Sequence, residues 1–124
     1  MKIRILGNSI RFRLREPEVQ QFQRSGNVTE TTTFGPEPTD QIKFVLEQSV
    51  ETELAINYNL GTTIIKVPKH LAEEWVGTNL VGFEGTVVTG KGQRIELLVE
   101  KDFVCLDRPD EENEGAYPHP KTVC

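Results

Sequence analysis

Apolar and basic residues alternate at the start of the chain, in the segment KIRILGNSIRFRLR. The alternation continues on both sides of Gly7 and Asn8. Period-two patterning around a glycine-containing dipeptide predicts a β-hairpin with a two-residue turn. That turn pairs Ile3 with Phe12, so the apolar residues of both strands share one face.

The same order of elements then occurs twice along the chain. Segments with a proline near the start and a glycine nine positions later predict short helices over 16–26 and 68–77. Runs rich in β-branched and aromatic residues predict strands at 2–6, 9–15, 28–34, 41–48, 53–59, 62–67, 80–88 and 94–103. The result is strand-strand-helix-strand-strand in each half, 1–49 and 53–106.

Two such units predict a mostly β fold (α+β). We expect a compact barrel or sandwich with pseudo-twofold symmetry, its ends plugged by the two short helices. Residues 1–106 are interpreted as one globular domain, and residues 107–124 as an acidic, proline-containing C-terminal tail.

The charge is distributed very unevenly between the tail and the rest of the chain. The net charge is −5, and the block DRPDEENE at 107–114 holds five carboxylates against one arginine, so it carries most of that charge. Such a block buries little apolar surface, which favours a solvated tail. The alternative is that it lies across a basic surface, as a counter-charge or as an autoinhibitory strap.

The hairpin register places like charges opposite each other, because Arg4 faces Arg11 and Lys2 faces Arg13. Like charges in directly opposed positions destabilise a sheet. No acidic residue precedes Glu16 to offset them. An anionic group is therefore expected near the hairpin, unless its basic side chains spread apart in water.

Two sources of negative charge remain open. One is internal, from neighbouring carboxylates such as Glu30 and Glu47 or from the tail. The other is an external anion, either a phosphate-bearing ligand or nucleic acid. The candidate anion-binding residues are Arg4, Arg11, Arg13 and Arg15.

A second candidate site lies where the last predicted strand meets the tail, at Lys101, Asp102 and Cys105. Lys101 and Asp102 are adjacent in a strand, so their side chains should point to opposite faces. Metal-binding residue types also gather here, namely Cys105, Asp107, Asp110, Glu111, Glu112, His119 and Cys124, but in no zinc or EF-hand spacing. TGKG at 89–92 lacks the P-loop pattern. We therefore expect no cofactor and no resident metal.

The segment IIKVPKHLAEEWVGTNLVGFEG resembles the strand, Pro-Lys, helix, glycine, strand unit of AbrB-type swapped-hairpin barrels, and the paired units resemble those of the related double-psi barrels. In this chain Gly77-Thr78-Asn79 stands where that family usually has Gly-Asp. The resemblance implies a dimeric, DNA-binding regulator that would use the arginines of the hairpin.

The two ends of the chain, KIRILGNSIRFRL and LLVEKDFVCL, resemble those of a small bacterial family with no assigned activity. That likeness brings no site to transfer. It draws attention to Asn8, Arg11, Lys101, Asp102, Phe103 and Cys105.

Composition narrows the classes of partner and compartment. No apolar run approaches the roughly 18 residues of a membrane span, and the first residues lack the pattern of a signal peptide. Two cysteines make no disulfide framework, so a cytoplasmic, reduced protein is expected. The acidic balance argues against a general nucleic-acid binder. Edge strands make a homodimer compatible with the sequence.

The favoured hypothesis is a small binding or accessory domain without catalytic activity, which recognises an anionic partner through the arginine-rich hairpin. Two alternatives stay open. One is an enzyme or metal-dependent protein with its site near Lys101, Asp102 and Cys105. The other is the AbrB-like DNA-binding regulator.

Overall fold

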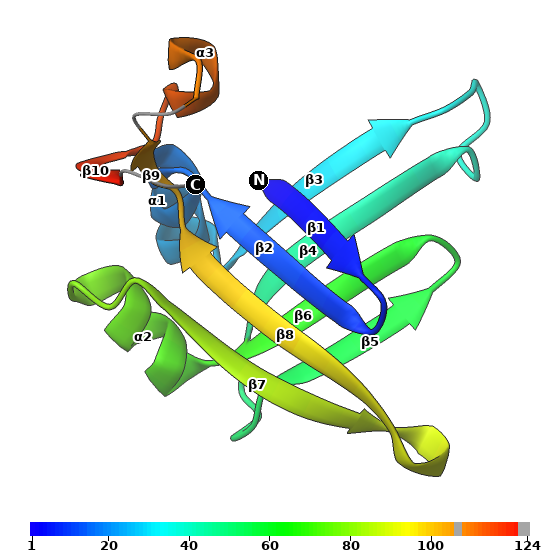
Figure 1. Ribbon diagram of the computed structural model, residues 1–124. Coiled ribbons are helices and arrows are strands. Elements are labelled where there is room, and N and C mark those ends of the chain that lie inside the picture. Colours follow the sequence, from blue (N-terminus) through cyan, green and yellow to red (C-terminus); the bar gives the residue numbers. More distant parts are fainter. Residues whose placement is uncertain (106–107, 122–124) are drawn as a thin grey trace.

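The computed structural model describes residues 1–105 and 108–121 (Figure 1). The strands are β1 (Lys2–Leu6), β2 (Ser9–Leu14), β3 (Asn27–Thr33), β4 (Gln41–Ser49), β5 (Ala55–Asn59), β6 (Thr62–Pro68), β7 (Gly82–Thr89), β8 (Gln93–Lys101), β9 (Phe103–Cys105) and β10 (Tyr117–Lys121). The helices are α1 (Glu16–Ser25), α2 (Lys69–Gly77) and α3 (Asp110–Asn113), with a 3-10 turn η1 at Gly90–Gly92. None of these helices is long and apolar enough to cross a bilayer.

Two mixed four-stranded sheets form the body of the protein. Their strand orders are β1-β2-β8-β7 and β3-β4-β6-β5. In each sheet two antiparallel hairpins, one from each half of the chain, join through a parallel central pair, β2 with β8 and β4 with β6. The mostly β class and the repeated order of elements are therefore confirmed. Each half of the chain contributes one hairpin to each sheet.

The sequence predicted a barrel or a sandwich, and the described residues form no closed barrel; they form two four-stranded sheets and the two-stranded pair β9–β10. The helices also differ from their expected places. Both α1 and α2 lie at the same end of the sheets (Figure 1), where the rings of Phe22 and Trp75 meet with centroids 5.9 Å apart. Each helix buries its own aromatic residue against the other, so they close one end together.

The hydrophobic core lies between the two sheets and extends under the helices. Phe12 of β2 packs edge-on against Phe44 of β4, with ring centroids 6.0 Å apart. Trp75 of α2 packs edge-on against Phe83 of β7 and donates its indole N–H to the carbonyl of Val81 at 3.0 Å. Aromatic pairs of this geometry add to the stabilisation that burial provides.

The β1–β2 hairpin has the predicted register. Gly7 adopts a positive φ of 55° in the turn, which a residue without a Cβ adopts at little cost. Ile3 lies opposite Phe12, and Arg4 lies opposite Arg11. The crowding of like charges expected from the sequence is therefore a feature of the fold.

The end of β8 departs from the prediction of one strand over 94–103. The strand ends at Lys101, and the backbone N–H of Asp102 donates to the carbonyl of Leu14 at 2.7 Å. The chain then resumes as the short strand β9, which pairs in parallel with β10. Asp102 therefore sits at the junction between the sheet and the tail.

The described part of the tail holds α3 and β10, a secondary structure that its composition did not predict, while its acidic residues at 110–112 and 114 are exposed to solvent. Tyr117 packs against the hydrophobic core, backbone hydrogen bonds tie β10 to Asp102 and β9, and side-chain contacts hold the rest. The side-chain amide of Asn113 donates to the carbonyl of Cys105 at 2.9 Å and accepts from its N–H at 2.8 Å. Arg108 binds the buried carboxylate of Asp102. Asp107 and residues 122–124 lie outside the described residues.

Gly82 marks a close approach between β7 and β8. A Cβ at this position would lie 2.5 Å from the carbonyl oxygen of Val99 and 2.8 Å from the Cβ of Glu100. Gly82→Ala is therefore expected to lower the free energy of unfolding by about 1.5 kcal/mol, because the added methyl group would overpack this contact and force the backbone to shift. Urea unfolding measures this, with Gly77→Ala as the matched control, since a Cβ there meets open space. Equal stability of the two variants would contradict the packing described.

Candidate functional site

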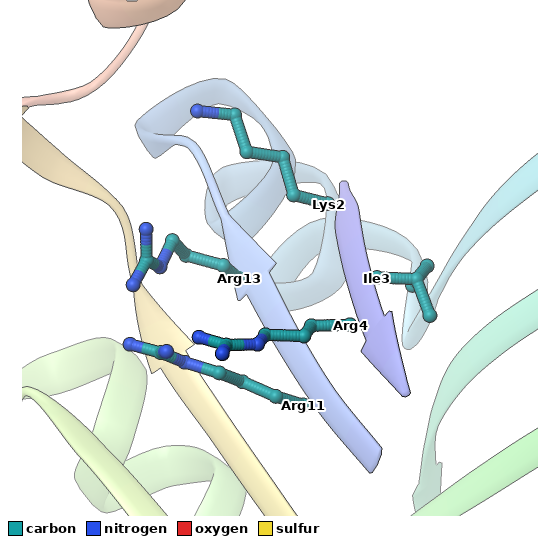
Figure 2. A pocket seen from close by; sticks show the side chains of 5 residues that line it. All are labelled: Lys2, Ile3, Arg4, Arg11 and Arg13. Atoms are coloured by element: carbon teal, nitrogen blue, oxygen red, sulfur yellow. The ribbon is translucent and has the colours of Figure 1, made fainter. Parts of the chain in front are cut away.

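Four basic side chains extend from one face of the β1–β2 hairpin, and Ile3 extends from the other (Figure 2). We call Lys2, Arg4, Arg11 and Arg13 the basic face. They surround a shallow depression of about 170 Å³. The alternation of each strand places them together, because every second residue points to the same side of a sheet.

Glu100 of β8 is the first internal counter-charge of the basic face. Its Oε1 accepts from Arg11 Nε at 2.7 Å and from Arg13 Nε at 3.1 Å, and Arg11 Nη2 also contacts it. The parallel pairing of β2 with β8 places Glu100 directly beside Arg13. Glu100 is buried, so these charge-assisted contacts are shielded from water.

Asp102 is the second counter-charge, and it is 1% exposed. Its carboxylate pairs with Lys2 Nζ at 3.0 Å and with Arg108 Nη1 at 3.2 Å. Lys2 also donates to the backbone carbonyl of Glu112 at 3.2 Å. Asp102 thus joins the basic face to the tail.

Arg4 differs from the other members of the basic face. Within residues 1–105 and 108–121, its guanidinium makes no ion pair or hydrogen bond. Its side chain lies beside that of Arg11 (Figure 2). A second depression, of about 220 Å³, is lined by both arginines together with Leu6, Ser9 and Leu98. The Arg4–Arg11 pair is therefore bordered by a depression on each side.

The basic face keeps an excess of positive charge. Including Arg108, there are five cationic side chains for the two buried carboxylates of Glu100 and Asp102, and four of them pair with these carboxylates while Arg4 does not. One shared carboxylate oxygen cannot neutralise both Arg11 and Arg13. The arrangement is thus suited to hold a further negative charge, and Arg4 is the member of the basic face whose guanidinium donors are all unused within the described residues.

The neutralising residues differ from those named in the sequence analysis. Glu30 binds the N-terminal ammonium of Met1 at 2.6 Å, and Glu47 makes no ion pair in the part of the chain that the structure describes. The described carboxylates of the tail also form no ion pair with the basic face; they are Asp110, Glu111, Glu112 and Glu114. The tail reaches the face through Arg108 and a backbone carbonyl instead.

Arg15 does not join the other candidate arginines. Strand β2 ends at Leu14, and Arg15 becomes the N-cap of α1, with its Nε 3.6 Å from Glu18 Oε1. It lines neither depression of the basic face. The alternation of basic and apolar residues continues through Arg15, so it does not indicate this change of direction.

The alternative set Lys101, Asp102 and Cys105 is divided between separate surroundings. Lys101 points away from Asp102, as predicted, and donates to the carbonyl of Thr78 at 2.9 Å. Cys105 is buried and disulfide-bonded, so it offers no free thiol in this structure. These three residues therefore do not form one catalytic group.

Among the residues that the structure describes, metal ligands are likewise not brought together. No group of three or more His, Cys, Asp or Glu side chains suited to a metal ion occurs among the described residues. Of the ligand types noted in the tail, Asp107, Cys124 and the side chain of His119 lie outside that part of the chain. The carboxylate of Asp102 is already paired with two basic side chains, those of Lys2 and Arg108.

Three residues that matter here were missed by sequence reasoning, namely Glu100, Arg108 and Asn113. Glu100 could in principle have been found from the sequence, because the alternation along β8 places its side chain on the face of the sheet that points away from the core. Its partners on β2, however, lie almost ninety residues away, and nothing local in the sequence indicates that pairing.

Comparison with known proteins gives a family and no activity. Neither the curated proteins nor the solved structures contain a match to this chain. The AbrB-type resemblance thus remains a hypothesis from a short motif. The family of unknown function DUF7009 matches residues 1–121, and the chain belongs to that family.

Proposed function

We propose that the protein is a small binding domain that recognises an anionic group at its basic face, with Arg4 and Arg11 as the main contacts. The observation that carries this proposal is the position of Arg4. It lies directly opposite Arg11 in the hairpin and has no carboxylate partner in the described chain. A negatively charged ligand would relieve that repulsion.

The chemistry of the face favours a phosphate-type oxyanion. Guanidinium groups donate in a fixed fork that matches the oxygens of phosphate. The two depressions, of about 170 and 220 Å³, lie on either side of the Arg4–Arg11 pair and are small and open. A compact, multiply charged anion suits them better than an extended apolar molecule.

Replacing Arg4 by glutamine is expected to weaken the binding of inorganic pyrophosphate by about tenfold, because one charge-assisted contact is lost. Isothermal titration calorimetry at low ionic strength measures the dissociation constant. Arg24→Gln is the matched control, since Arg24 is an exposed arginine in the last turn of α1. It carries the same change of charge at a distance from the face.

Two results would overturn the proposal: no pyrophosphate binding by the unmodified protein, or equal losses in Arg4→Gln and Arg24→Gln. The same titration with a short DNA duplex separates the DNA-binding alternative. A nucleic-acid site would bind the duplex more tightly than pyrophosphate and show a steep loss of affinity with salt. A small-anion site would show the reverse preference.

A further inference from the structure

A larger cavity, of about 630 Å³, lies on the other side of the β8 end and shares no residue with the basic face. Phe103 contributes an aromatic wall, and the charged and polar lining comes from Glu16, Thr78, Asn79, Lys101 and Tyr117. The volume falls in the range of small-molecule sites, which are mostly apolar with a few converging polar groups.

Lys101 is the most unusual residue of this cavity. It is 5% exposed, although lysine is almost never buried without an acidic partner. Its ammonium donates to the carbonyl of Thr78 at 2.9 Å and lies 5.5 Å from the centre of the Tyr117 ring. Within the described chain no carboxylate pairs with it. Donors and charge of this ammonium therefore remain available to a ligand.

The environment of the ammonium is unfavourable for its charge. Burial lowers the pKa of Lys101 below its ordinary value, because a charged group loses its hydration. Burial and the nearby charge of Glu16 raise the pKa of Tyr117 to about 12. The Tyr117 hydroxyl accordingly keeps its proton and can donate a hydrogen bond.

Glu16 supplies the opposite charge in the same cavity. It stands in the first turn of α1 and makes no ion pair within the described residues, so it does not neutralise Lys101. One cavity thus holds a cation and an anion that lie too far apart to pair with each other. A ligand with complementary opposite charges would satisfy both.

We propose that this cavity binds a zwitterionic amino acid with an apolar side chain. The carboxylate of the ligand contacts Lys101, and its ammonium contacts Glu16. The apolar side chain packs against Val76 and Phe103, which line the same cavity. A simple anion would meet repulsion from Glu16, and a simple cation would meet repulsion from Lys101, so both charges of the ligand are used for recognition.

Calorimetric titration with leucine, N-acetylleucine and leucinamide tests the proposal. Leucine is expected to bind at least about tenfold more tightly than either blocked form, since each lacks one of the two charges. Lys101→Met should weaken leucine binding by about tenfold, and it should not weaken the binding of leucinamide, because that cation no longer meets the repulsion of Lys101. Lys91→Met, which removes an exposed lysine from the β7–β8 turn, is the matched control.

Three outcomes would overturn this inference: no leucine binding into the millimolar range, equal binding of the three compounds, or equal effects of the two lysine substitutions. The comparison of ligands uses only the unmodified protein, so it decides the question even if Lys101→Met does not fold. Because the cavity and the basic face share no residue, the outcome is independent of the pyrophosphate experiments.

Discussion

Replacing Asp102 by asparagine is expected to lower the free energy of unfolding by about 3 kcal/mol, the scale on which buried ion pairs respond to the loss of one partner. The carboxylate is 1% exposed and serves both Lys2 and Arg108. Asparagine keeps the shape of the side chain but removes the charge, which leaves the buried guanidinium of Arg108 without a counter-ion. Urea denaturation followed by tryptophan fluorescence gives the change directly.

Asp110→Asn is the control for that experiment. Asp110 begins α3, is exposed and makes no ion pair among the described residues. Its substitution changes the net charge equally and should alter stability by less than about 0.5 kcal/mol. If the two variants unfold at the same urea concentration, Asp102 does not hold the tail to the sheet as described.

Replacing Glu100 by glutamine is expected to act in two directions. Stability should fall by about 2 kcal/mol, because Arg11 and Arg13 lose their shared carboxylate in a largely buried position. Pyrophosphate affinity should rise by about tenfold, because the same loss frees both guanidinium groups and increases the local positive charge. Urea denaturation and calorimetric titration measure the two effects separately.

Glu96→Gln is the matched control, since Glu96 lies on the same strand but is exposed and unpaired in the described chain. It makes the same change in net charge, so a general electrostatic effect would appear in both variants. Tighter pyrophosphate binding confined to Glu100→Gln supports competition between the carboxylate and the external anion. Weaker binding in that variant would contradict it.

The hairpins could be predicted from the sequence because their information is local. Alternation around Gly7 and Asn8 determines which side chains share a face, and the observed pairing of Arg4 with Arg11 follows from it. The sheet order could not be predicted in this way. The parallel pairing of β2 with β8 joins segments far apart in sequence, and no turn between them limits the register.

The basic residues of the candidate site could be predicted from the sequence, and the carboxylates that pair with them could not. Residues Glu100, Lys101 and Asp102 form a run of three buried charges at the end of β8. Such a run resembles a solvated strand end in sequence, because charged residues are rarely buried. The structure sends Glu100 and Asp102 to the basic face and Lys101 to the other cavity. The end of β8 therefore contributes to both proposed sites.

The most direct test of anion recognition is an NMR titration that follows the arginine Nε–Hε resonances as pyrophosphate is added. The resonance of Arg4 is assigned from its absence in Arg4→Gln. We predict that Arg4 and Arg11 shift together and saturate, while Arg24 does not move. If Arg4 stays unshifted at saturation, or if Arg24 shifts by as much, the basic face is not the binding site.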